Sequence, residues 1–201
     1  MVDASDLTKP AKLIKASKAF KENYPQNSDP GPYIIGIGDS FKITQFSNDG
    51  ESLDITVRTK RVSEKGTVNF LEFGRLKVEG LTQSELEEIV YQKFVQNGVL
   101  PNFEIELVGF NSKRIFVSAE AGSPRTIPYT NVPIFLDDVL SQISVQNNTG
   151  TDSKITIYRG DKVYTLSLSK VSKDSNVKVR MKANDRIYVA PIIFRKEAVL
   201  I

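Results

Sequence analysis

The sequence predicts a β-rich α+β protein made of two small domains, in each of which mixed strands surround one helix. Many short segments alternate apolar with polar residues, the pattern of strands that bury one face. Two segments, residues 86–94 and 136–143, instead repeat apolar residues at the spacing of one helix face. A length of 201 residues allows one large core or two modest ones. Because strands surround a helix twice along the chain, we expect two domains.

The chain opens with a predicted N-terminal arm and linker, residues 1–32. Over residues 8–24 lysines recur at every third position among apolar residues, which predicts a short surface helix. Residues 23–32 contain Pro25, Pro30 and Pro32, and proline removes backbone donors and fixes turns. We therefore expect a linker between the arm and a folded body that starts at residue 33.

The first predicted domain covers residues 33–110 and contains the longer helix. Residues 82–85 read Thr-Gln-Ser-Glu, a capping box that starts this helix, and Asn97-Gly98 is a typical helix end. Alternating segments predict its strands at residues 41–46, 53–57, 67–71, 76–78 and 103–108.

The second predicted domain covers residues 111–201, and the boundary lies in the turn at residues 110–113. A short helix is expected at residues 135–143, after Pro133. A polar loop follows at residues 147–153. Strands are expected at residues 114–117, 154–159, 162–168, 177–179 and 186–189, of which 154–159 and 162–168 form a hairpin.

The composition narrows the possible chemistry. The chain contains no cysteine and no histidine, which excludes disulfides, thiolate metal sites and imidazole-based catalysis. Gly36 and Gly38 are followed by a predicted strand and lack the third glycine of a nucleotide-binding loop. We therefore expect no enzyme, and no catalytic, cofactor-binding or metal-binding residues.

The charge is unevenly distributed along the chain. Residues 1–150 hold 16 Lys/Arg and 19 Asp/Glu, whereas residues 151–201 hold 11 and 5. A basic region could meet an acidic polymer or a membrane surface, but basic residues without a recognition motif are usually a solvated face. We expect no nucleic acid as partner.

Two short segments resemble each other and predict the role of two aspartates. Residues 36–43 and residues 182–189 both place an aspartate, Asp39 or Asp185, after a Gly or Asn and before an alternating strand. Glycine and asparagine tolerate left-handed backbone, and an aspartate carboxylate can bond to nearby amides. We interpret both aspartates as residues of a strand-entry turn.

The order of motifs resembles the bacterial polysaccharide export family. The first motif, at residues 33–43, is a tyrosine, an apolar pair, Gly-x-Gly-Asp and a strand. The second comprises glycine-separated strands at residues 62–70 and 74–82, which run into Gly-Leu-Thr. The third is a proline-led strand and its successor, residues 101–107 and 112–117. The resemblance implies an export-signature domain followed by a soluble-ligand-binding β-grasp (SLBB) domain, so that the second domain is β-grasp-like.

The resemblance assigns a structural, family-motif role to ten residues. These are Tyr33, Gly36, Gly38, Asp39, Gly66, Gly74, Gly80, Thr82, Pro101 and Asp185. The second domain departs from the family pattern, because Ser118–Pro124 replaces the usual Gly-Glu-Val and Pro-Gly. The lipid-modified cysteine and the long C-terminal amphipathic helix of some members are also absent.

The resemblance further implies a subunit of a homo-oligomeric ring or conduit for capsular or extracellular polysaccharide. Its partners would be other copies of itself, the polysaccharide, and inner-membrane export or chain-length machinery. Its location would be the periplasm or the periplasmic side of the outer membrane. No targeting signal and no apolar run of about 18 residues are visible in the chain.

Two alternatives stay open at this point. A structural ring component of a virion or tail could use the same β-grasp modules, which would fit the absence of a signal segment. A soluble small-ligand binder would instead present a saturable pocket.

Overall fold

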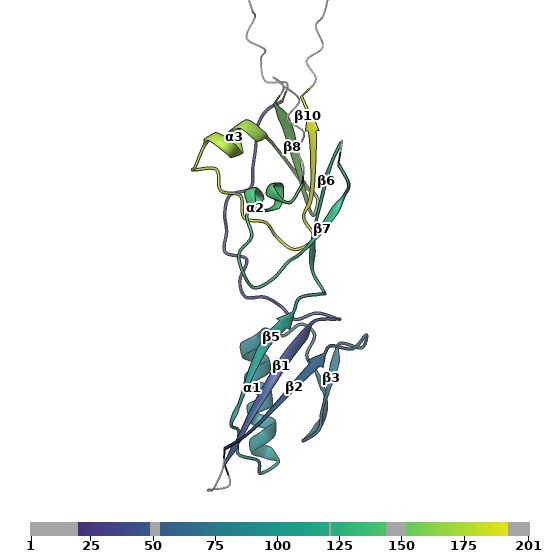
Figure 1. Ribbon diagram of the computed structural model, residues 1–201, viewed down its shortest axis with the longest axis vertical. Coiled ribbons are helices and arrows are strands. Elements are labelled where there is room, and N and C mark those ends of the chain that lie inside the picture. Colours follow the sequence, from purple (N-terminus) through teal and green to yellow (C-terminus); the bar gives the residue numbers. More distant parts are fainter. Residues whose placement is uncertain (1–19, 49–52, 121, 144–151, 193–201) are drawn as a thin grey trace, which may run out of the picture.

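The computed structural model describes residues 20–48, 53–120, 122–143 and 152–192 (Figure 1). These residues form a mixed α+β, strand-rich structure with three sheets and short helices. The first sheet has three antiparallel strands in the order β2-β1-β5. Its strands are β1 (Ser40–Asn48), β2 (Leu53–Arg61) and β5 (Phe103–Gly109).

Helix α1 (Gln83–Gln96) covers one face of this sheet and completes the first core. Its buried residues Leu86, Val90 and Phe94 recur at helical spacing and pack with buried strand residues such as Phe41 and Ile105. The capping box is confirmed. The Thr82 hydroxyl accepts a hydrogen bond from the Glu85 amide at 3.2 Å, and the Glu85 carboxylate accepts one from the Thr82 amide at 2.7 Å.

A hairpin extends the same core beyond β2. It consists of β3 (Thr67–Phe70) and β4 (Gly74–Lys77), so β4 starts two residues before the predicted strand at residues 76–78. Val68 and Phe70 are buried, and the Phe70 ring stacks on Phe73 at 4.6 Å between centroids. Aromatic packing therefore ties the hairpin to α1, since Phe73 also meets Phe94 edge to face at 5.6 Å.

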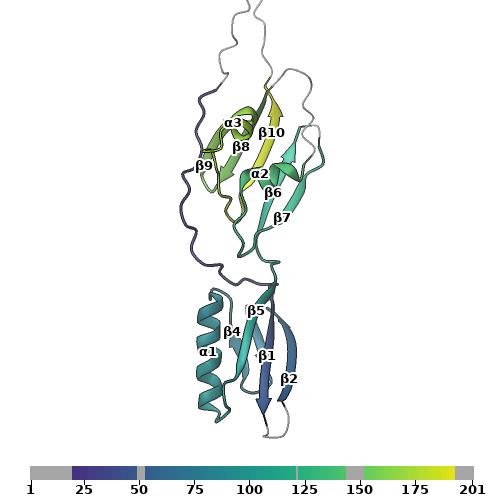
Figure 2. The same cartoon turned by 60° about the vertical axis from the view of Figure 1, so that its left-hand side comes forward.

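The second domain contains a five-stranded sheet in the order β7-β6-β10-β8-β9 (Figure 2). The strands are β6 (Arg114–Ala119), β7 (Arg125–Pro128), β8 (Ser153–Arg159), β9 (Lys162–Ser167) and β10 (Arg186–Pro191). The central pair β6 and β10 is parallel and the other pairs are antiparallel. Helix α2 (Leu136–Ser141) packs on one face. This is the β-grasp arrangement that the resemblance implied.

Three local predictions in this domain need correction. Residues 177–179 alternate buried and exposed side chains, but they form no strand of the sheet. The Val179 carbonyl instead accepts a hydrogen bond from the Leu136 amide at 2.9 Å, so the segment pairs with the start of α2. The short strand β7 was not predicted, because its four residues end in Pro128 and proline is unusual in strands other than edge strands.

The third correction concerns the end of the predicted strand at residues 162–168. β9 ends at Ser167, and a helix that was not predicted, α3 (Leu168–Lys173), follows at once, so the described part of this domain contains α3 in addition to α2. Leu168 and Val171 both pack against the second core. Residues three apart face the same side in a helix and opposite sides in a strand, which explains why the helix is preferred here.

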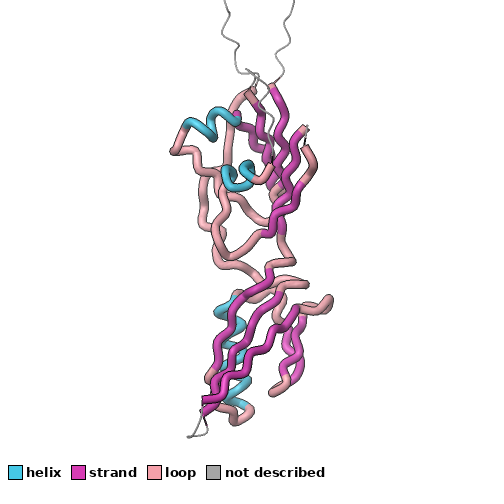
Figure 3. The backbone as a smooth tube through the Cα atoms, in the orientation of Figure 1, coloured by secondary structure: helices cyan, strands magenta, loops and turns pink. Residues whose placement is uncertain are grey.

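Residues 20–29, here called the strap, lie along the second domain before the chain enters the first (Figure 3). Asn23 and Thr165 exchange backbone hydrogen bonds of 2.8 and 2.9 Å, so the strap covers the outer edge of β9. The helix predicted over residues 8–24 does not extend through residues 20–24, and residues 8–19 lie outside the described residues. None of the helices in the described ranges is long and apolar enough to cross a membrane.

Candidate functional site at the junction of the two domains

A buried carboxylate joins the two domains. Asp39, which is 0% exposed, lies directly before β1 and accepts hydrogen bonds from nearby residues and from the turn that connects β5 to β6. On its own side it accepts from the Tyr33 hydroxyl and the Gly36 amide, each at 2.8 Å. Across the junction it accepts from the Asn111 amide, the Ser112 amide and the Ser112 hydroxyl, each also at 2.8 Å. Each carboxylate oxygen therefore has at least two donors.

The turn at residues 36–39 sets the position of this carboxylate. The Asp39 amide donates to the Gly36 carbonyl at 3.2 Å, and Gly38 has a φ of +90°, which strongly favours glycine. A Cβ atom at Gly36 would lie 2.5 Å from both the Cβ and the Oγ of Ser112. Glycine at position 36 is therefore required by the close approach of the second domain.

Aromatic and cationic side chains surround the carboxylate. The Tyr33 ring meets Phe110 edge to face at 5.1 Å and stacks on Tyr129 of the second domain at 6.4 Å. The Lys113 ammonium lies 4.2 Å from the Tyr33 ring centroid and donates to the Ile34 carbonyl. Both ionisable groups respond to burial, which raises the pKa of Tyr33 well above its usual value and lowers the pKa of Lys113.

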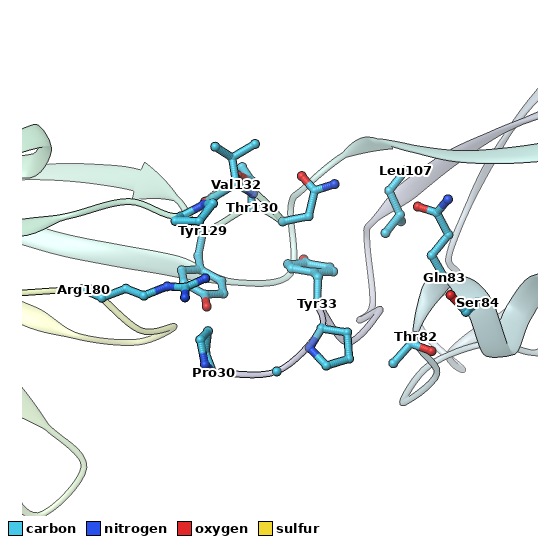
Figure 4. A pocket seen from close by; sticks show the side chains of 14 residues that line it. Pro30, Tyr33, Thr82, Gln83, Ser84, Leu107, Tyr129, Thr130, Val132 and Arg180 are labelled. Carbon is cyan, nitrogen blue, oxygen red and sulfur yellow. Dashed lines mark hydrogen bonds between the residues drawn. The ribbon is translucent and has the colours of Figure 1, made fainter. Parts of the chain in front are cut away.

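A cleft of about 290 Å³ lies beside this junction (Figure 4). Figure 4 shows Tyr33 and Tyr129 next to each other on one side, and Thr82 and Gln83 at the start of α1 on the other. The Thr82 hydroxyl is held by the capping box, and the Gln83 amide donates to the Ile105 carbonyl at 2.9 Å. Within the described ranges, no group of three or more acidic side chains is placed to hold a metal ion. The side chains of Thr82 and Gln83 are thus occupied by structural bonds.

The second predicted aspartate occupies an equivalent turn. Asp185 is 0% exposed and accepts from the amide three residues earlier, Lys182, at 2.7 Å, just as Asp39 accepts from Gly36. Asn184 has a φ of +66°, matching Gly38 in the first turn. Arg159 completes this site with two hydrogen bonds, Nε to Oδ1 at 2.9 Å and Nη2 to Oδ2 at 2.6 Å. The predicted turn role of both aspartates is confirmed by these bonds.

Comparison with known proteins assigns both halves of the chain. Residues 27–108 match the family described as polysaccharide biosynthesis/export protein, and residues 113–189 match the SLBB domain. The chain therefore combines a domain of the polysaccharide biosynthesis/export family with an SLBB domain. This family consists of export proteins and is not a catalytic family.

Two relatives are both named EPS I polysaccharide export outer membrane protein EpsA. The protein from Ralstonia nicotianae is 24% identical over 218 residues, which cover 93% of this chain and 57% of that protein. The protein from Ralstonia solanacearum is 29% identical over 156 residues, which cover 68% of this chain and 41% of that protein. The chain thus spans about half the length of the export proteins that it matches.

The export-family motif residues fall into two groups in the structure. Tyr33, Gly36, Gly38 and Asp39 come together at the junction. The others lie elsewhere: Gly66 in the turn before β3, Gly74 at the start of β4, Gly80 and Thr82 before α1, Pro101 before β5, and Asp185 before β10. Gly80 approaches the junction through its amide, which donates to the Ile35 carbonyl at 2.9 Å.

Sequence reasoning missed the partners of both carboxylates. The sequence indicates a turn at Asn111, the start of the third motif at Ser112 and Lys113, and the end of a strand at Arg159, but no carboxylate partner for any of them. The one available signal was the polar Asn-Ser-Lys run between two strands, which does not indicate a carboxylate 72 or 73 residues away.

Proposed function

We propose that this chain is a non-enzymatic subunit of a homo-oligomeric ring or conduit for capsular or extracellular polysaccharide. The observation that supports this most directly is the junction, where one buried carboxylate of the export-family domain accepts five hydrogen bonds, three of them from the turn at residues 111–112 that leads into the SLBB domain. Head-to-tail subunits close into a ring only if each is rotated by the same angle from its neighbour. A subunit whose two domains are held at a constant angle meets that requirement.

The remaining features of the proposal follow the family. Its partners are further copies of the chain, the polysaccharide and inner-membrane export or chain-length machinery, and its place is the periplasm or the periplasmic side of the outer membrane. The relatives are described as outer membrane proteins, which favours this reading over a virion or tail component. The proposed domains are residues 33–110 and residues 111–201. The ten motif residues are proposed to have a structural role.

A groove on the second domain is a proposed contact for the polymer. It measures about 650 Å³ and lies on the sheet face opposite α2, where Tyr158 and Tyr188 are 45% and 39% exposed. Tyrosine rings present apolar faces that can pack on sugar rings, and Arg186, which also lines the groove, can donate to hydroxyl or carboxylate oxygens.

Binding of the purified polymer to the full chain tests this contact. We expect Tyr158→Ala and Tyr188→Ala to weaken binding of the host polysaccharide in microscale thermophoresis by at least about tenfold in combination. Tyr91→Ala, which truncates a tyrosine that is also 45% exposed but lies on α1, serves as the control. Equal binding by all three variants would exclude the groove.

Export itself is tested in cells. Deleting the complete gene should abolish extracellular polysaccharide, and the wild-type gene should restore it, measured as uronic acid or total sugar in the medium. Light scattering of the purified chain at rising concentration should show masses that are multiples of one subunit. Normal export in the deletion strain would refute the proposed function.

A further inference from the structure

A row of three side chains crosses the second sheet at the groove. The register of β6 and β10 places Phe116 beside Arg186, and the register of β10 and β8 places Arg186 beside Tyr158. Arg186 and Tyr158 both line the groove. The row spans two strand spacings, roughly 10 Å, which is comparable to the length of a disaccharide. A cationic side chain therefore lies between two aromatic ones.

The row projects from the face of the sheet that the helices leave uncovered. Residues that alternate with it in each strand belong to the second core, against which α2 and α3 also pack. Figure 1 shows both helices on the same side of this sheet. Phe116 and Tyr158 are 39% and 45% exposed, and Arg186 is exposed as well. All three side chains can therefore contact a partner.

The guanidinium of Arg186 is available for such a partner. Its central carbon lies 5.7 Å from the Phe116 ring centroid, so the ring supports one side of the cation. Within the described ranges, no residue accepts a hydrogen bond from this guanidinium. The planar group thus presents its N–H donors to the groove.

This face of the sheet carries positive charge that is not neutralised within the domain. Arg114 lies on it two residues before Phe116, and neither Arg114 nor Arg186 forms an ion pair with another described residue. No aspartate or glutamate occupies a described position on this face of β6, β8, β9 or β10. Asp161 lies beyond the strand ends, in the turn between β8 and β9, and Asp185 is buried. The face is therefore suited to an anion.

We propose that the groove binds an acidic polysaccharide, with the carboxylate of a sugar such as a uronic acid on Arg186 and the adjoining sugar rings on Tyr158 and Phe116. The proposal rests on the proposed function and specifies the class of polymer. A guanidinium binds a carboxylate through two parallel hydrogen bonds, which gives geometric selectivity as well as attraction. Aromatic rings present apolar faces on which sugar rings can pack.

An acidic polymer explains the groove better than a neutral one does. A neutral chain could pack on Tyr158 and Phe116, but it would remove water from Arg186 without supplying an opposite charge. Burying a cation without a partner is costly. A carboxylated sugar supplies that charge at the centre of the row.

Other anionic partners match the surface less well. A lipid bilayer is flat on the scale of one domain, whereas the groove is a concave space of about 650 Å³. Binding to nucleic acid usually engages several cations along the phosphate chain. The groove and its border offer two unpaired arginines, Arg114 and Arg186, which suits a polymer whose charges are more widely spaced.

Calorimetric titration of the full chain with an oligogalacturonate, before and after methyl esterification, tests the role of the carboxylate. Esterification removes the charge and leaves the sugar rings and the chain length unchanged. We expect the free acid to bind at least about tenfold more tightly at low salt. The difference should shrink at about 0.5 M salt, because ions screen the attraction. Equal binding of the two forms, or no binding of the free acid, would overturn the proposal.

Two single variants separate the arginine from the aromatic contact. Arg186→Gln should weaken binding of the free acid by at least about tenfold and leave binding of the ester unchanged, which also shows that the variant is folded. Tyr158→Ala should weaken binding of both forms, because its ring contacts the sugar and not the charge. Arg75→Gln, which removes an exposed arginine of β4 that has no ion-pair partner among the described residues, is the matched control and should change neither. An Arg186→Gln variant that binds the free acid like the wild type contradicts the proposal.

Single-stranded DNA of the same net charge distinguishes a sugar site from a general polyanion site. We expect it to bind at least about tenfold more weakly than oligogalacturonate, because its charges are phosphates along a different backbone. DNA binding that equals oligogalacturonate binding and is lost in Arg186→Gln would overturn the proposal.

The host polysaccharide separates this proposal from the proposed function. Carbodiimide-activated reduction converts its carboxylates to alcohols, and the reduced polymer should bind the full chain at least about tenfold more weakly than the native polymer. Equal binding of native and reduced polymer would overturn the acidic specificity and leave the export role standing. Normal export after deletion of the gene would instead remove the export role, whatever the titrations show.

Discussion

The carboxylate of Asp39 accepts two hydrogen bonds from Ser112, one from the backbone amide and one from the hydroxyl, each at 2.8 Å. Asp39 precedes the first strand of the export-family domain, and Ser112 precedes the first strand of the SLBB domain. Because every other donor to this carboxylate comes from residues 33, 36 and 111, the pair lies at the centre of the junction. One buried, fully bonded acid is therefore the centre of the contacts that join the two domains, together with the Tyr33–Tyr129 stack and the bond from Lys113 to the Ile34 carbonyl.

Asp39→Asn should destabilise the protein by about 3 kcal/mol, since it replaces a carboxylate oxygen with an NH₂ group. Both oxygens face backbone amides, Gly36 on one side and Asn111 with Ser112 on the other, so the new NH₂ group opposes a donor in either orientation. Urea denaturation followed by circular dichroism measures the change. Asp54→Asn, at an exposed position on β2, should change the free energy of unfolding by less than about 0.5 kcal/mol. Equal effects of both variants would contradict the central role of Asp39.

Gly36→Ala should also be destabilising, by about 1–3 kcal/mol, because the added Cβ atom collides with Ser112. The cause can be isolated in a double-mutant cycle. In a Ser112→Gly background the colliding atoms are gone, and Gly36→Ala should then cost at least about 1 kcal/mol less than in the wild type. Additive effects of the two changes would show that the close approach does not limit position 36.

Deprotonation of Tyr33 should lower the stability of the protein at high pH. Burial raises the pKa of its hydroxyl in the folded state, so the folded protein holds this proton more tightly than the unfolded chain. The stabilisation that the protonated Tyr33 hydroxyl contributes to folding is complete below the unfolded pKa of 10.0 and is lost as the pH rises above it. The slope attributable to one proton is at most about 1.4 kcal/mol per pH unit.

Comparison of the wild type with Tyr33→Phe between about pH 8 and 11 isolates this effect. The free energy of unfolding of the wild type should fall more steeply than that of the variant. Lys113, whose pKa burial lowers, acts with the opposite sign in this range, because raising the pH relieves the penalty of its buried charge. It is present in both proteins and largely cancels in the difference. Parallel curves would refute the assignment.

Arg159→Met should cost about 3–5 kcal/mol, because it leaves the buried carboxylate of Asp185 without its cationic partner. Arg159→Lys keeps the charge but loses the bidentate hydrogen bonding of the guanidinium, so we expect a smaller loss of stability, about 1–3 kcal/mol. Thermal denaturation of the two variants gives the order. A lysine variant less stable than the methionine variant would indicate that packing, rather than charge, dominates at this site.

Local patterns predicted the turns and caps of this protein well. The similarity of residues 36–43 and 182–189 predicted two equivalent aspartate turns, and Thr-Gln-Ser-Glu at residues 82–85 predicted the start of α1. These features are encoded within three or four neighbouring residues. A single sequence can therefore display them completely.

Long-range pairings were not predictable in the same way. The alternation at residues 177–179 is real, since Val177 and Val179 are buried, but alternation does not say whether a sheet edge is available for pairing. Likewise Leu168 continued the alternation of β9, and only the position of the second core decides that a helix begins there. The donors to Asp39 and Asp185 come from distant segments for the same reason.

The strap determines how the chain carries tension. Hydrogen bonds hold the strap on the SLBB domain: Asn23 is bonded to Thr165, and the Asn27 side chain accepts from the Arg180 amide. At the start of the strap, the Lys154 ammonium lies over the Phe20 ring. Lys154 also pairs with Ala190 of β10, close to the last described residue. A pull between residues 20 and 192 would thus be borne by the SLBB domain and its strap. The export-family domain lies in the chain between the strap and the SLBB domain, so it would bear no force until the strap detached.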